Sequence, residues 1–121
     1  MKSREKLFMS KRTPKLLLED ILESADKISR YSNHLSFEDF TNDEKTLDAV
    51  VRNFEIIGEA ANRLPEEFKA QHPEIDWQKI RGFRNRIVHD YFGIDLSIVW
   101  EIKEKFLPTL KQEILKLHNS I

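Results

Sequence analysis

Cysteine is absent from the 121 residues, which excludes disulfides and thiolate metal sites. Glycine and proline are scarce, with three and four residues, and no apolar run is longer than three residues. Such short runs exclude a membrane-spanning helix and the apolar segment of a secretory signal. We therefore expect a cytoplasmic protein with no membrane partner.

The composition that remains is typical of a folded helical protein. Hydrophobic residues make up 40% of the chain and charged residues 34%. The length fits one domain, and the formal net charge of -1 does not decide whether nucleic acid is a ligand, because basic residues cluster locally. We expect a single domain over residues 13–121, preceded by an N-terminal extension over residues 1–12 that is a candidate for disorder.

The first half of the chain places apolar residues at helical spacing in two long segments. One begins at Thr13-Pro14, a typical N-cap and first-turn pair, and ends near Ser32. The other follows a predicted capping box of Thr41 and Glu44 and must stop or kink at Pro65. Brief helical turns are expected over residues 36–40 and 65–70.

Two further helices are predicted in the second half. Asp76 is expected to cap the third helix, which Gly93 breaks. Asp95 is expected to cap the fourth, with a bend near Pro108. No strand pattern is present, so the prediction is an all-α fold, an antiparallel four-helix bundle with short extra helical turns.

The second long helix is apolar over a wide arc. Phe54 and Ile57 share it with Ile56, Gly58 and Ala60, which lie on other faces. One interpretation is that a homodimer covers the additional surface, since symmetric dimers are the commonest oligomers. The alternative is a bundle that is well packed around a central helix.

Chemistry is concentrated in the third helix, between residues 84 and 91. Arg84 offers a planar, permanently charged group suited to phosphate, and His89 can take and give a proton near neutrality. Asn85 and Tyr91 accompany them, and Arg81 and Arg86 are candidate contacts to RNA phosphate. These residue types favour chemistry on phosphodiesters. The plainer interpretation is a solvated arginine beside a half-buried histidine.

The spacing of the two candidate catalytic residues bears on the mechanism. On a regular helix Arg84 lies about 140° around the axis from His89. Metal-free RNA cleavage needs a base, an acid and a cation, yet one chain supplies a single suitable histidine here. A dimer that pairs the two third helices would place two copies of His89 and Arg84 around one cleft.

No cofactor or metal is predicted. His34 and His72 fall in predicted loops and His118 lies near the terminus, without partners at a ligand spacing, so surface positions are expected. Trp77 and Trp100 are expected to pack in the core, with base stacking as the alternative.

The sequence also resembles a known family. Arg84-Asn85 followed by His89-Asp90-Tyr91 is similar to the Arg-x4-His-x-Tyr motif in the HepT branch of HEPN domains. The segments from Arg52 to Ala61 and from Trp77 to Asn85 are similar as well, so the likeness covers roughly residues 13–117.

The resemblance implies a function. HepT-like proteins are dimeric ribonuclease toxins encoded beside a minimal nucleotidyltransferase antitoxin, MntA, which transfers AMP to the motif tyrosine. It implies that Arg84 and His89 are catalytic, that Asn85 supports them and that Tyr91 is the AMP acceptor. The expectation is an endoribonuclease toxin, and the alternative is a non-catalytic nucleotide-binding subunit of a nucleotidyltransferase complex. For Tyr91, the plainer interpretation is a ring that packs and a hydroxyl that forms an ordinary hydrogen bond.

Overall fold

The structure is a computed structural model that describes residues 12–93 and 95–121. Most of the predicted N-terminal extension lies outside these residues. Arg12 is described, and its guanidinium forms two hydrogen bonds of 2.8 Å with the carboxylate of Asp20. In the described part of the chain, no helix is both long and apolar enough to cross a membrane.

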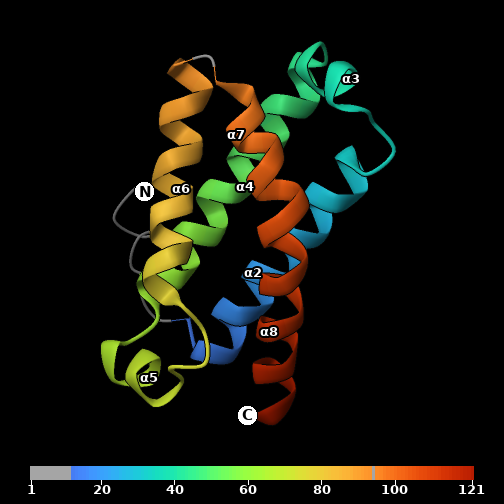
Figure 1. Cartoon of the computed structure of the whole chain (residues 1–121). Helices are drawn as coiled ribbons and strands as arrows, with labels where there is room; N and C mark the ends of the chain where they lie inside the picture. The colour runs from blue at the N-terminus through green and yellow to red at the C-terminus, as the bar shows by residue number, and fades with distance from the viewer. Residues whose placement is uncertain (1–11, 94) are drawn as a thin grey trace, which may run out of the picture.

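Four long helical segments form the predicted bundle (Figure 1). They are α2 (Pro14–Ser32), α4 (Glu44–Arg63), α6 (Trp77–Gly93) and a last segment made of α7 (Leu96–Glu101), η1 (Ile102–Phe106) and α8 (Leu107–Ser120). α2 packs against α4 and α8, and α4 also packs against α6. The short helices α3 (Phe37–Thr41) and α5 (Glu66–Gln71) confirm the two predicted turns.

Helix α2 begins where the sequence predicted. The Thr13 side chain accepts a hydrogen bond from the backbone N–H of Leu16 at 3.2 Å, and Pro14 opens the helix. Asp76 does the same for α6, because its carboxylate accepts from the N–H of Lys79 at 3.0 Å. In both cases a side-chain oxygen satisfies one of the N–H groups that a helix start leaves without a partner.

The predicted capping box of Thr41 and Glu44 is wrong. Asp43 is the N-cap of α4 and accepts from the N–H of Thr46 at 3.1 Å. Thr41 instead ends α3, and its hydroxyl donates to the Glu38 carbonyl. A carboxylate is a strong cap and accepts the Thr46 hydroxyl as well, at 2.8 Å, so Asp43 prevails over the nearby threonine.

The last helical segment is irregular where a bend was expected. Asp95 stands at the N-cap of α7, but its carboxylate accepts the Ser97 hydroxyl and no helix N–H. The π-helical η1 ends at Phe106, two residues before Pro108. Proline has no N–H to donate to a carbonyl one turn earlier, and a wider turn accommodates this loss.

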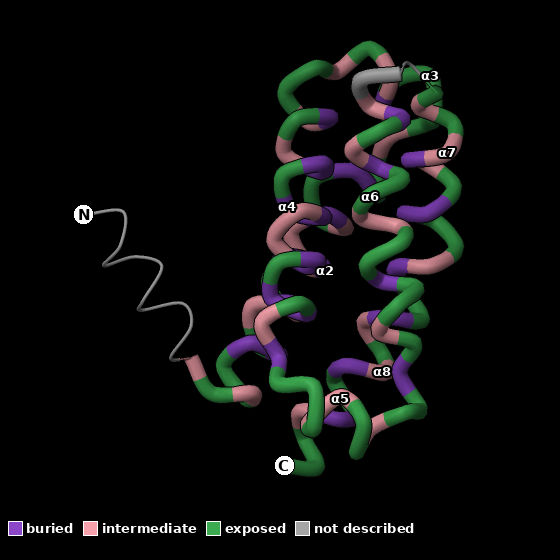
Figure 2. Tube along the Cα trace, turned by 90° about the vertical axis from the view of Figure 1, so that its left-hand side faces the viewer, coloured by how far each residue is buried: buried purple, intermediate pink, exposed green. Residues whose placement is uncertain are grey.

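Buried residues lie along the sides of the long helices that face one another (Figure 2), and most of them are apolar. Trp77 and Trp100 are half-buried and pack against this core. Helix α4 does not need a second chain to cover its wide apolar arc, because Ala60 is fully buried within one chain and Gly58 is covered by Arg84. Among the additional apolar residues, only Ile56 is partly exposed.

Candidate active site on helix α6

Helix α6 presents three different faces. Ile80 and Ile87 point into the core. The residues at positions 77, 81 and 84 follow one another at about one turn on the side toward α4, where they line two neighbouring hollows. Asn85 and His89 lie on the solvent side, and the His89 side chain is 81% exposed.

Arg84 crosses α4 at a glycine. A Cβ atom at Gly58 would stand 2.5 Å from Cγ and 2.9 Å from Cβ of Arg84, which no real contact allows. Glycine inside a helix costs about 0.5–1 kcal/mol relative to alanine. At this position it gives the stem of Arg84 the space to lie against the α4 backbone.

The Arg84 guanidinium forms a hydrogen bond with its neighbour in the chain and leaves another of its donors without a partner among the described residues. Its Nη1 donates to Oδ1 of Asn85 at 2.9 Å. Its Nε is buried and has no hydrogen-bond partner among the described residues. A buried N–H without an acceptor is costly, so Nε is suited to an oxygen that a ligand would bring.

A small hollow of about 130 Å³ opens beside this arginine. It is lined by Gly58, Glu59, Asn62, Arg81 and Arg84. The carboxylate of Glu59 is engaged by Arg63 at 2.8 Å. Within the described residues, no carboxylate forms an ion pair with Arg81 or Arg84. The hollow therefore has an excess of positive charge and the donors that a phosphate requires.

The carboxylate of Asp90 contacts the His89 ring at Nδ1. This carboxylate is only 5% exposed, and it lies 3.2 Å from Nδ1 of His89 and 2.6 Å from Nε of Arg86. Burial opposes the ionisation of Asp90, but the hydrogen bonds from Arg86 and His89 outweigh it and lower the pKa of the carboxyl group. An ionised Asp90 can only accept a hydrogen bond, so Nδ1 of His89 is the donor and, in the neutral ring, Nε2 carries the lone pair.

Asp90 was the residue that sequence reasoning overlooked. It stood in the motif as an unassigned position between His89 and Tyr91. The available signal was the spacing of four residues from Arg86, which is typical of a helical ion pair. That ion pair also places the Arg86 guanidinium with Asp90, away from the hollow that Arg81 and Arg84 share.

One chain does not bring Arg84 and His89 together. Arg84 lies against α4, whereas His89 points to solvent from another side of α6. The separation expected from helical geometry is therefore retained in the fold. A phosphate bound by Arg84 would need a second source of the imidazole, or a strand that wraps around α6.

Tyr91 bridges α6 and α4. Its ring is half-buried, and its hydroxyl donates a hydrogen bond to the carboxylate of Asp48. This bond, together with burial, raises the pKa of the Tyr91 hydroxyl. In this structure Tyr91 thus packs its ring and forms a hydrogen bond through its hydroxyl, as in the plainer interpretation. Asp48 was not singled out in the sequence, because its neighbour comes from a helix 43 residues later.

Of the remaining histidines, which were expected at the surface, His72 and His118 are half-buried. His34 is exposed in the loop after α2. His72 and His118 each stand near one carboxylate, at 3.7 Å from Glu74 and 2.9 Å from Glu19. In the described ranges, no three histidine, aspartate or glutamate side chains are grouped closely enough to hold a metal ion.

The fold and the site define a class of protein. A small all-α bundle that carries Arg-Asn-x3-His-x-Tyr on its third long helix is a HEPN-type domain. The ribonuclease HepT-like family matches residues 21–117, and the chain belongs to that family.

Similar proteins have names of the same kind. The chain is 42% identical over 107 residues to "Probable ribonuclease HepT" of Thermococcus cleftensis, which covers 88% of this chain and 97% of the relative. It is 38% identical over 106 residues to "Putative RNase TTE0752" of Caldanaerobacter subterraneus, covering 88% of this chain and 95% of that protein. No solved structure matches it.

Proposed function

We propose that this protein is a metal-independent endoribonuclease that acts as a homodimer. The proposal rests on the contacts of two side chains of α6, Arg84 and His89. Arg84 offers an uncompensated cation beside a hollow that fits a phosphate, and His89 offers an exposed Nε2 whose ring is oriented by Asp90. The names of the relatives support RNA as the substrate.

The proposed reaction needs no group beyond these side chains and the RNA. Nε2 of His89 removes the proton of a ribose 2′-hydroxyl, and the 2′-oxygen attacks the adjacent phosphorus. Arg84 stabilises the negative charge that develops on the phosphorane. The bond to the 5′-oxygen then breaks, and a second imidazole donates a proton to this leaving oxygen. The products are a 2′,3′-cyclic phosphate and a 5′-hydroxyl end.

The second imidazole is His89 of the partner protomer. Gly82 supports a close approach on this side of α6, because a Cβ atom there would meet nothing within 4 Å. Packing within the described chain therefore does not require glycine at this position. Alanine would also favour the helix more than glycine does. A partner helix that comes close to this face would benefit from the missing side chain.

Regulation by AMPylation completes the proposal. A minimal nucleotidyltransferase antitoxin would transfer AMP from ATP to Tyr91: Oη loses its proton to a base and attacks the α-phosphorus, and pyrophosphate leaves. This step first requires Tyr91 to leave Asp48. The added nucleotide brings negative charge and bulk to the site, and both oppose the binding of RNA phosphate. The protein would then be the toxin of a toxin-antitoxin pair in the cytoplasm.

Cleavage of RNA by the purified protein tests the enzymatic proposal. We expect full activity in excess chelator, cyclic-phosphate ends on the products, and losses of about 10²- to 10⁴-fold in His89→Ala. The alternative function is a non-catalytic subunit that binds nucleotide phosphate through the same residues. It predicts no turnover and a greater loss of binding in Arg84→Ala than in His89→Ala, and this result would refute the ribonuclease.

A further inference from the structure

We infer that the groove between α4, α5 and the first turns of α6 is a subsite for one unpaired nucleotide of the RNA, with its base on Trp77 and its phosphate on Arg81. This inference rests on the proposed function and extends the same site. It gives Trp77 a task beyond packing, and it sets the direction in which the strand leaves Arg84.

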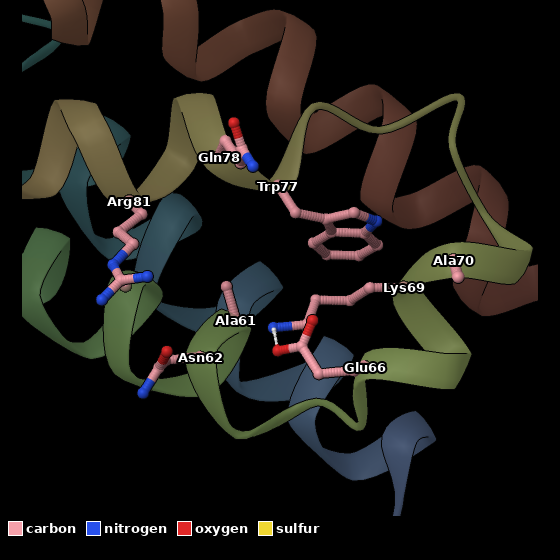
Figure 3. Close-up of a pocket in the computed structure, with 9 residues that line it drawn as sticks. Ala61, Asn62, Glu66, Lys69, Ala70, Trp77, Gln78 and Arg81 are labelled. Atoms are coloured by element: carbon pink, nitrogen blue, oxygen red, sulfur yellow. Dashed lines mark ion pairs between the residues drawn. The ribbon is translucent and has the colours of Figure 1, made fainter.

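The groove is continuous with the hollow at Arg84. It has a volume of about 320 Å³ and shares Gly58, Asn62 and Arg81 with the smaller hollow. Trp77 and Lys69 lie at one end, and Asn62 and Arg81 at the other (Figure 3). A strand bound by Arg84 can therefore continue into this groove without leaving the surface of α6.

Trp77 is held in place as a platform. Its indole N–H donates to the His72 carbonyl at 3.0 Å, which fixes the plane of the ring. The ring is half-buried, and it lines the groove with the atoms that remain accessible. A rigid, partly exposed indole is well suited to stacking on a base, and such stacking tolerates any base.

The charges in the groove favour an anion next to that ring. Glu66 forms an ion pair of 3.1 Å with Lys69, so these two charges offset each other. Arg81 is exposed, and no hydrogen bond or ion pair joins its guanidinium to another described residue. Trp77, Arg81 and Arg84 thus present an aromatic ring and two cations, each about one helical turn from the next.

This sequence of groups fits single-stranded RNA better than other anions. A nucleotide supplies both the flat ring for Trp77 and the phosphate for Arg81, whereas an acidic peptide supplies only charge. In a duplex the bases are stacked on one another and cannot reach the indole, so the ligand must be unpaired.

Binding to the inactive full-length His89→Ala protein tests the subsite without any need for cleavage. The probes are a short labelled single-stranded RNA and the same RNA with abasic sites. We expect Trp77→Leu to weaken binding of the normal RNA about tenfold and to have little effect on the abasic RNA. Arg81→Gln should weaken both and lower the salt dependence by about one phosphate contact.

The controls separate the groove from the rest of the molecule. Lys79→Gln changes a cation on another face of α6, beside Phe83 and Phe106, and should leave the affinity unchanged. Fluorescence quenching by RNA should disappear in Trp77→Phe, which keeps an aromatic ring in the fold, and persist in Trp100→Phe.

The outcomes distinguish this inference from the ribonuclease. Equal affinity of the folded Trp77→Leu variant, quenching that persists in Trp77→Phe, equal weakening of normal and abasic RNA, or no RNA binding would each overturn the subsite. Trp77-dependent binding without any cleavage by the wild-type protein would retain the subsite and remove the enzymatic function.

Discussion

Gly58 of α4 lies directly beneath the stem of Arg84 of α6, with 2.5 Å between an ideal Cβ at position 58 and Cγ of Arg84. The contact involves the beginning of the arginine side chain, which cannot move aside without turning the whole residue. Gly58 therefore acts as a positioning residue for the guanidinium. The proposed phosphate site therefore depends on the absence of a Cβ atom at position 58.

The first prediction is that Gly58→Ala reduces RNA cleavage about as strongly as Arg84→Ala. The added methyl group displaces the arginine from the hollow, and the crowding lowers the free energy of unfolding. Arg84→Ala removes the clash with Cγ but keeps Cβ, which would stand 2.9 Å from the added methyl group, so in that background Gly58→Ala should lower the free energy of unfolding by less than in the wild type. Denaturant titration of the four proteins measures this non-additivity, and an additive result would contradict it.

Asp90→Asn should lower kcat by at least about tenfold while RNA binding changes little. The amide cannot hold the Nδ1 proton as a carboxylate does, so the imidazole loses its orientation and its preferred tautomer. A shifted pH profile of kcat would separate this effect from simple destabilisation. Arg86→Gln is the matched control, because it leaves the carboxylate on His89 and should have the smaller effect.

The same aspartate should affect the acid stability of the fold. Its folded pKa lies below the ordinary value of 3.8. The group therefore stabilises the protein above the unfolded pKa, and this contribution is lost as the pH falls through the folded pKa. Urea titrations between pH 3 and 6 should show a flatter profile for Asp90→Asn than for the wild type. Parallel profiles would show that the ion pairs of Asp90 do not contribute to the pH dependence of the free energy of unfolding.

Mixing inactive chains tests the shared cleft. Arg84→Ala and His89→Ala chains, each inactive, should recover a small part of the activity together, because a mixed dimer retains one His89 as the base and one Arg84 as the cation, and water must replace the second imidazole as the acid. Gly82→Trp should prevent close approach of the two α6 helices and yield a monomer by light scattering. Gln112→Trp on the exposed side of α8 is the control and should remain dimeric. A monomeric wild-type protein at micromolar concentration would refute the cleft.

Tyr91 should be the site of AMPylation. Co-expression with the cognate nucleotidyltransferase is expected to add the mass of one or more AMP groups, mapped to Tyr91. Tyr91→Phe preserves the ring against the core and should escape neutralisation, whereas Tyr31→Phe, which alters an exposed tyrosine elsewhere, should be modified normally. An adduct confined to another residue would contradict this assignment.

Lys103 should make the fold more stable in alkaline solution. Only 2% of the residue is exposed, its Nζ has no hydrogen-bond partner among the described residues, and burial lowers its pKa despite Glu104 nearby. The unfolded chain therefore binds a proton more readily, and the free energy of unfolding should rise with pH from the lowered pKa toward 10.5. Lys103→Met should be more stable at pH 7 and lack this rise. Thermal unfolding at several pH values measures both effects.

Much of the fold follows from local patterns in the sequence. The spacing of apolar residues predicts the long helices, and Thr13, Asp76 and Pro65 mark their limits, because caps and breaks depend on neighbours within one turn. The start of α4 was misplaced because two candidate caps, Thr41 and Asp43, stand two residues apart. Their competition is settled by hydrogen-bond geometry, which the sequence alone does not contain.

In the candidate site, too, some features follow from the sequence and others only from the tertiary structure. The sequence by itself determined that Arg84 and His89 lie on different sides of one helix, since each residue turns the chain by about 100°. Only the tertiary structure decided what each side meets. Gly58 and Asp48 belong to another helix, and they reach Arg84 and Tyr91 because α4 and α6 pack together. Contacts between distant segments depend on the register of packed helices, and no local pattern encodes that register.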